Sequence, residues 1–130
     1  MPQTLQQMIE AANAVVPKID RAQAEALMAE GALILDVRDA PELAAAGKVA
    51  GARHVSRGML EFRADAASPL HDPAFDPGRP VVVYCGAGGR AALAGATLHA
   101  MGFARVHNLG AFKDWVAAGG AVEHPLEGGM

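Results

Sequence analysis

Apolar residues recur at two different spacings along this chain, and the changes in spacing mark its predicted elements. Near the N-terminus they recur every three or four residues, which is typical of one face of an amphipathic helix. These positions are Leu5, Met8, Ile9, Ala12 and Val16. Thr4 and Gln7 have the spacing of a capping box, and Pro17 stops the pattern. The first segment is therefore predicted to be an amphipathic helix that carries an apolar face.

Short and almost continuous apolar runs follow, and such runs are typical of strands covered on both faces. The predicted strands are residues 32–37, 51–55, 81–84 and 106–108. Helical patterns separate them, over residues 20–31, 39–46, 56–62, 90–101 and 112–118. Strands that alternate with helices predict an α/β fold with a parallel sheet, in which ligands bind at the carboxyl ends of the strands. Residues 64–80 contain four prolines and are predicted to be a long surface connection, where we expect any disorder.

Composition narrows the class of protein. The 130 residues are 52% hydrophobic and 19% charged, which suits one domain with one core. The single cysteine excludes an internal disulfide and favours a reducing compartment, and neither a signal peptide nor an apolar run that could span a bilayer is evident. A net charge of −3 argues against nucleic acid as a partner. We therefore expect a cytoplasmic protein with no membrane association.

The one cysteine, Cys85, lies where the strand-like run ends and a glycine-rich loop begins. The loop consists of Gly86, Ala87, Gly88, Gly89 and Arg90, and a helical pattern follows it. A tight turn into a helix points backbone N–H groups and a positive helix end at the sulfur, which favours the ionised thiolate. The alternative is an inert core cysteine, since free cysteines are often buried. The glycines favour a reactive nucleophile.

Charged residues near the other predicted strand ends have less specific roles. Arg90 is predicted either to stabilise an anion at the rim of the loop or to pair with buried Asp36 and hold the loop in shape. Arg57, directly after a strand, is a candidate for attracting anionic substrates. Arg38 and Glu42 are interpreted as a surface ion pair. The scattered histidines lack metal-ligand spacing, so no metal is expected.

Taken together, four motifs in this order make the chain resemble the rhodanese family. They are residues 35–39 with Glu42, residues 47–55, residues 85–90 and residues 110–115. The chain departs from the family pattern at Lys48, where histidine is frequent, and at Ala111, which replaces the second glycine of a pair. The resemblance implies a three-layer domain, with a central parallel sheet and helices on both faces, that acts as a single-domain sulfurtransferase.

The resemblance also implies a mechanism without a cofactor. Cys85 would carry sulfane sulfur as a persulfide, taken from thiosulfate or another persulfide donor and passed to cyanide or a thiol, which includes a cysteine of a partner protein. Two alternatives stay open. One is a binding or sensing module without turnover. The other is a cysteine-based phosphatase, although related phosphatases have one more residue in the loop than the four between Cys85 and Arg90.

The domain organisation is predicted from the extent of the motifs. Residues 1–18 form an N-terminal helical extension, residues 19–124 the rhodanese-like domain, and residues 125–130 a flexible C-terminal tail. The apolar face of the first helix packs either on its own domain or on a second copy, so we expect a monomer or a weak homodimer.

Overall fold

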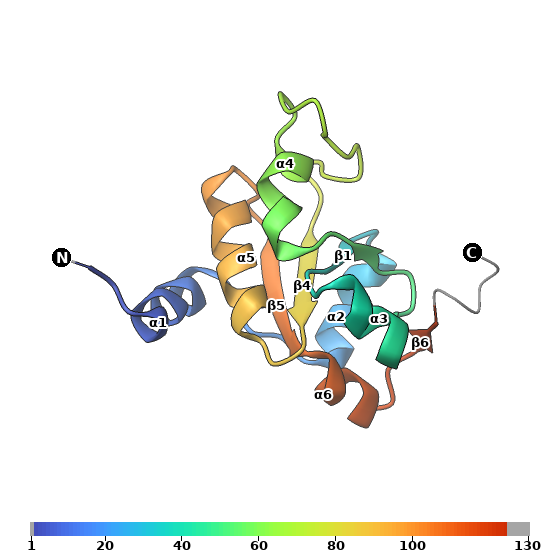
Figure 1. Ribbon diagram of the computed structural model, residues 1–130. Coiled ribbons are helices and arrows are strands. Elements are labelled where there is room, and N and C mark those ends of the chain that lie inside the picture. Colours follow the sequence, from blue (N-terminus) through green and yellow to red (C-terminus); the bar gives the residue numbers. More distant parts are fainter. Residues whose placement is uncertain (1, 125–130) are drawn as a thin grey trace.

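A computed structural model describes residues 2–124 and contains a four-stranded parallel sheet at its centre (Figure 1). The strand order is β3-β1-β4-β5 and every neighbouring pair is parallel. The strands are β1 (Leu33–Asp36), β3 (Arg53–His54), β4 (Val81–Cys85) and β5 (Val106–Ala111). The predicted parallel α/β sheet is thus confirmed. Strand β3 was predicted to be longer, over residues 51–55, and only two of its residues pair with β1.

Helices cover both faces of this sheet, as the three-layer prediction requires. They are α1 (Leu5–Val15), α2 (Arg21–Ala29), α3 (Ala40–Ala46), α4 (Leu60–Ala64) after a 3₁₀ turn at Arg57–Met59, α5 (Gly89–Ala100) and α6 (Phe112–Ala117). Strand β4 shows why two cores form, because its side chains alternate between the faces. Val81, Val83 and Cys85 belong to one apolar cluster, and Val82 and Tyr84 belong to the other.

Helix α1 packs against α5 of its own domain (Figure 1). The predicted capping box is present: the Thr4 side chain accepts from the Gln7 N–H, and the Gln7 side chain accepts from the Thr4 N–H. Ala12 and Val16 are buried, whereas Leu5 is 64% exposed and Met8 is 44% exposed. The apolar face of the helix is therefore only partly covered within the described residues. The limits proposed for the extension, residues 1–18, remain a prediction.

The segment from residue 64 to residue 80 is a long connection without a strand, as predicted, but it is anchored to the core. Phe75 is buried and its ring meets that of Phe103 edge to face, with centroids 6.1 Å apart. Asp65, Asp72 and Asp76 each accept a hydrogen bond from the N–H two residues further on, which builds successive turns.

A second, two-stranded antiparallel sheet joins β2 (Lys48–Val49) to β6 (Val122–Glu123), and the pattern of the sequence did not predict it. The predicted tail at residues 125–130 lies outside the described residues. Within residues 2–124, no helix has both the length and the apolar composition needed to cross a bilayer.

Candidate active site

Cys85 is the last residue of β4, and its sulfur lies within the turn that leads to α5. The Sγ atom accepts hydrogen bonds from two backbone N–H groups, those of Gly88 at 2.9 Å and Ala91 at 3.3 Å. Cys85 is 1% exposed, so the sulfur lies on the floor of this loop. Two N–H donors and the start of a 12-residue helix therefore favour negative charge at the sulfur.

Gly88 makes the tight turn possible. Its φ is +103°, in the left-handed region that side chains rarely adopt, and it is the N-cap residue of α5. Its Cα faces Gly110 of β5, where an added Cβ atom would come within 3.7 Å of the Gly110 Cα. The loop therefore lies directly against the end of the neighbouring strand, which pairs with β4 through Cys85 and Ala111.

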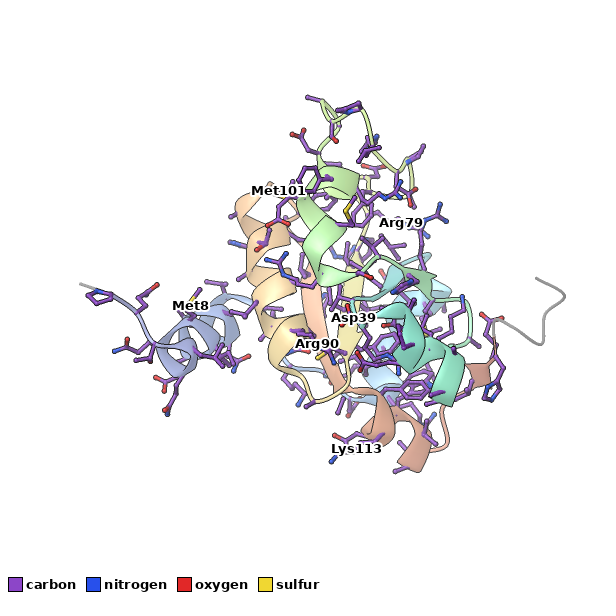
Figure 2. All side chains as sticks on the ribbon, viewed as in Figure 1. Met8, Asp39, Arg79, Arg90, Met101 and Lys113 are labelled. Carbon is purple, nitrogen blue, oxygen red and sulfur yellow. The ribbon has the colours of Figure 1, made fainter. Side chains whose placement is uncertain are left out.

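Arg90 is held by Glu42, the acidic residue in the first turn of α3. Its two terminal nitrogens donate to the two carboxylate oxygens at 2.7 Å and 2.9 Å. The hydrogen bond from Arg90 lowers the pKa of Glu42 to about 2, and the same bond raises the pKa of Arg90. The pair lies over Gly86, where an added Cβ would come within 3.0 Å of Arg90 Nη2. Figure 2 shows Arg90 between the start of α5 and α3, which begins after Asp39.

The predicted pairing of Arg90 with Asp36 is wrong. Asp36 is instead bound by Arg38 and by Tyr84, whose hydroxyl donates to Asp36 Oδ2 at 2.5 Å. All three residues are at most 3% exposed, so the interpretation of Arg38 and Glu42 as a surface ion pair is also wrong. Arg38 is two residues from Asp36, and both its backbone N–H and its guanidinium donate to the Asp36 carboxylate. The carboxylate oxygens of Asp36 are therefore already hydrogen-bonded and do not pair with Arg90.

The buried network of Asp36, Arg38 and Tyr84 holds helix α3 in place beside the loop. Arg38 donates to the Gly47 carbonyl at 2.7 Å, and its guanidinium lies 4.4 Å from the centre of the Phe112 ring. The Tyr84 hydroxyl also accepts from the Val49 N–H, and burial raises the pKa of Tyr84. The network ties both ends of α3 to the sheet, and α3 carries Glu42. Tyr84 was not among the predicted site residues, although a lone phenol in a run of valines indicates a buried polar partner.

Arg57 forms its hydrogen bonds with residues outside the Cys85 loop, and its role in attracting anionic substrates remains a prediction. Its guanidinium donates to Glu61 at 3.0 Å and to the Thr97 hydroxyl at 3.1 Å. Thr97 is seven residues beyond Arg90 on α5, which is about two helical turns. The structure thus brings Cys85, Gly86, Ala87, Gly88, Gly89 and Arg90 together in one loop, whereas Arg57 contacts the C-terminal part of α5.

A cysteine-centred loop between a parallel strand and a helix, locked by an acidic residue from the preceding α/β unit, defines a rhodanese-like domain. The family model described as the rhodanese-like domain matches residues 20–118, and the chain belongs to this family. Helix α1 precedes the matched residues.

Among its relatives, thiosulfate sulfurtransferase GlpE of Pseudomonas entomophila is 35% identical over 100 residues, which are 75% of this chain and 83% of that protein. The polysulfide-sulfur transferase homodimer of Wolinella succinogenes is 36% identical, with a TM-score of 0.71 over 88% of this chain and 83% of that one. A Rhodopseudomonas palustris protein of unknown function, described as a possible tyrosine phosphatase, is 39% identical, with a TM-score of 0.84 over 95% of this chain and 99% of that one.

Proposed function

We propose that the protein is a rhodanese-type sulfurtransferase that carries sulfane sulfur on Cys85, from thiosulfate or another persulfide donor to cyanide or a thiol. The observation that carries this proposal is the pair of backbone N–H groups, from Gly88 and Ala91, that donate to Cys85 Sγ. The relatives named as sulfurtransferases support the same class of reaction.

The loop suits both halves of such a reaction. The Cys85 thiolate attacks the outer sulfur of thiosulfate, a new S–S bond forms, and sulfite leaves with the electron pair of the broken S–S bond. The resulting persulfide anion keeps the charge that the thiolate had, so the same N–H donors stabilise it. Cyanide then attacks the outer sulfur, thiocyanate leaves, and the Cys85 thiolate is regenerated. No proton transfer is needed, which agrees with a loop that contains no general base.

Phosphate hydrolysis is a second candidate because of the description given to the Rhodopseudomonas palustris relative. The geometry of Arg90 favours sulfur over phosphate. Both of its terminal nitrogens donate to Glu42, so the Glu42 carboxylate already offsets the positive charge that a phosphate-binding arginine would offer to an oxyanion. The four residues between Cys85 and Arg90 form a small ring, and a persulfide sulfur needs less room than a phosphoryl group with three oxygens.

Intact-mass measurement tests the proposal directly. After incubation with thiosulfate, the protein should gain the mass of one sulfur atom and lose it again to cyanide or a dithiol. Cys85→Ser should gain nothing while unfolding at the same denaturant concentration as the parent, because a hydroxyl is a far weaker nucleophile than a thiolate near neutral pH. An unchanged mass with several sulfane donors would favour a binding module. Vanadate-sensitive hydrolysis of an aryl phosphate that disappears in Cys85→Ser would favour the phosphatase.

We also propose the cytoplasm as the compartment, because its reducing poise keeps the free Cys85 thiol available. Small anionic sulfur compounds and thiols are the proposed partners. Transfer to a partner protein's cysteine would require that thiol to reach the floor of the loop, where Cys85 is 1% exposed.

A further inference from the structure

The stretch of the loop that follows Cys85 has almost no side chains with which to hold its own shape. Residues 86–89 are glycine or alanine, so none of their side chains is larger than a methyl group. Glycine loses more conformational freedom on folding than any other residue, so such a loop depends on contacts from other segments. Gly88 and Ala91, whose N–H groups donate to Cys85 Sγ, lie on either side of Gly89 in the chain. A contact that holds Gly89 therefore bears on both donors.

Helix α1 supplies that contact through Ile9. A Cβ atom added at Gly89 would stand 3.5 Å from Ile9 Cδ1, which is an ordinary van der Waals distance. Apart from the local backbone, no other atom of residues 2–124 lies within 4 Å of that position. Ile9 also lines one pocket together with Gly88, Gly89 and Ala92. The end of the Ile9 side chain thus lies beside the bare Cα of Gly89, where the loop joins α5.

Ile9 is held in this position because α1 is anchored in the core at its other end. Val16 is the C-cap residue of α1, seven residues after Ile9 and about two helical turns away. It is 1% exposed and belongs to the same apolar cluster as Cys85. A Cβ atom added at Gly95 would stand 2.9 Å from Val16 Cγ1, so α1 and α5 approach closely at this glycine. The buried end of α1 therefore fixes Ile9 against the start of α5.

We propose that Ile9 is a positioning residue for the Cys85 loop: it restrains Gly89 and thereby keeps the N–H groups of Gly88 and Ala91 directed at the sulfur. Ile9 acts through Gly89 and takes no part in making or breaking bonds. The kinetic consequence rests on the proposed sulfurtransferase function. The proposal gives α1, which precedes the family match at residue 20, a role in the reaction.

The expected defect follows from the charge on the sulfur. Without Ile9 the loop samples conformations in which one or both N–H groups point away from Cys85 Sγ, so the thiolate is less stabilised. The thiolate is the nucleophile, so fewer molecules are ready to attack at neutral pH. At high pH the thiol ionises without help from the loop. The defect should therefore be largest near neutral pH and should shrink as the pH rises.

Steady-state kinetics on the full chain, with thiosulfate as donor and cyanide as acceptor between pH 6 and pH 9.5, tests this expectation. Ile9→Ala should lower kcat/KM for thiosulfate at pH 7 about threefold to tenfold, a partial loss of charge-assisted hydrogen bonding. Ile9→Val deletes only the Cδ1 methyl group that lies beside Gly89, so it should give a smaller loss in the same direction. Ile9→Leu keeps a terminal methyl group and should restore kcat/KM to within twofold of the parent.

Alkylation by iodoacetamide gives a second readout that needs no sulfur transfer, because Cys85 is the one thiol in the chain. The midpoint of its pH profile should move upward by about 0.5 to 1 pH unit in Ile9→Ala, which matches the kinetic loss. Met8→Ala is the matched control. It shortens the neighbouring apolar side chain of α1, which lines a groove with Leu93 and Thr97 of α5 and not with the loop. Both readouts should be unchanged in this variant.

Three results would overturn the assignment. They are parent-like values of both readouts in Ile9→Ala, an equal change in Met8→Ala, and a loss of kcat/KM that is the same at every pH. A purely structural role predicts the first of these, with a lower Tm as the sole effect. If Ile9→Ala fails to fold, the milder Ile9→Val decides the question. Failure of the underlying function looks different, because the unmodified protein would then transfer no sulfur from thiosulfate while the alkylation profile still reports on the loop.

Discussion

The ion pair between Glu42 and Arg90 should hold the Cys85 loop in place, and Glu42→Gln tests this. The substitution keeps the size of the side chain but removes the charge that receives two hydrogen bonds from Arg90. The pKa of Glu42 falls from 4.5 to about 2 in the folded protein. Taken at face value, at about 1.4 kcal/mol for each pKa unit, that shift would correspond to about 3.5 kcal/mol of stability.

Solvent reduces this figure. The side chains of Arg90 and Glu42 are 38% and 37% exposed, so water and salt screen their attraction. We therefore expect Glu42→Gln to lower the free energy of unfolding at pH 7 by about 1 kcal/mol, which for a chain of this size lowers Tm by about 3 to 5 °C. Because the folded pKa lies below the unfolded value, the stabilisation is fully present above pH 4.5 and is lost as the pH falls towards 2.

Urea unfolding of the parent and of Glu42→Gln at several pH values between 7 and 3 measures this effect. The two free energies should converge as the pH falls below 4.5. Glu25→Gln is the control, because Glu25 forms an exposed pair with Arg21 on α2 and should change stability by less than about 0.5 kcal/mol. A double-mutant cycle with Arg90→Lys isolates the coupling between the two residues. Equal stability of parent and variant at pH 7, or a difference at pH 3 as large as that at pH 7, would refute the reasoning.

Three further predictions concern packing and pH. An added methyl group at Gly95 would stand 2.9 Å from Val16 Cγ1, so Gly95→Ala should lower stability by about 1–2 kcal/mol despite the better helix propensity of alanine, and thermal unfolding should show a smaller loss in a Val16→Ala background. A methyl group at Gly120 would overlap the Trp115 indole, whose N–H donates to the Ala121 carbonyl at 2.9 Å; Gly120→Ala should lower stability by about 2–4 kcal/mol and shift the tryptophan emission to the red, and unchanged emission would contradict this. Burial, and next the charge of Arg105, lower the pKa of His107, and neither ring nitrogen has a hydrogen-bond partner among the described residues. His107 therefore binds a proton more tightly in the unfolded chain, so the free energy of unfolding should fall as the pH drops below 6.5. Urea unfolding of the parent and of His107→Leu at pH 7.5 and pH 5.5 should show a smaller fall in the variant.

Much of the architecture followed from local pattern. The apolar run at residues 81–84 was long and β-branched enough to predict β4, and the spacing of Thr4 and Gln7 predicted the capping box of α1. The two-residue strands β2 and β6 escaped prediction, because they are too short to have a period and form only when residues 48–49 and 122–123 meet in the folded chain.

One part of the candidate site also follows from local sequence, and another part does not. The position of Cys85 between a strand and a glycine-rich turn is local, so the sequence alone determined the nucleophile proposed here and the loop around it. The partner of Arg90 was not local. Asp36 and Glu42 are both acidic and both near the end of β1. Nothing in their spacing predicts which of them Arg90 contacts, because Arg90 lies 48 residues after Glu42.

Tertiary structure made that choice through competition for hydrogen bonds. Arg38 and the Tyr84 hydroxyl satisfy the buried Asp36 carboxylate, and the fold leaves Glu42 at the surface, within reach of Arg90. Lys18 likewise lies beside Asn108 because residues 17–19 pair with β5 at the edge of the sheet. The sequence determined which chemical groups the protein has and which segments carry them. Only the fold decided which charges are neutralised and which remain free to meet a substrate, because that depends on contacts between segments far apart in the chain.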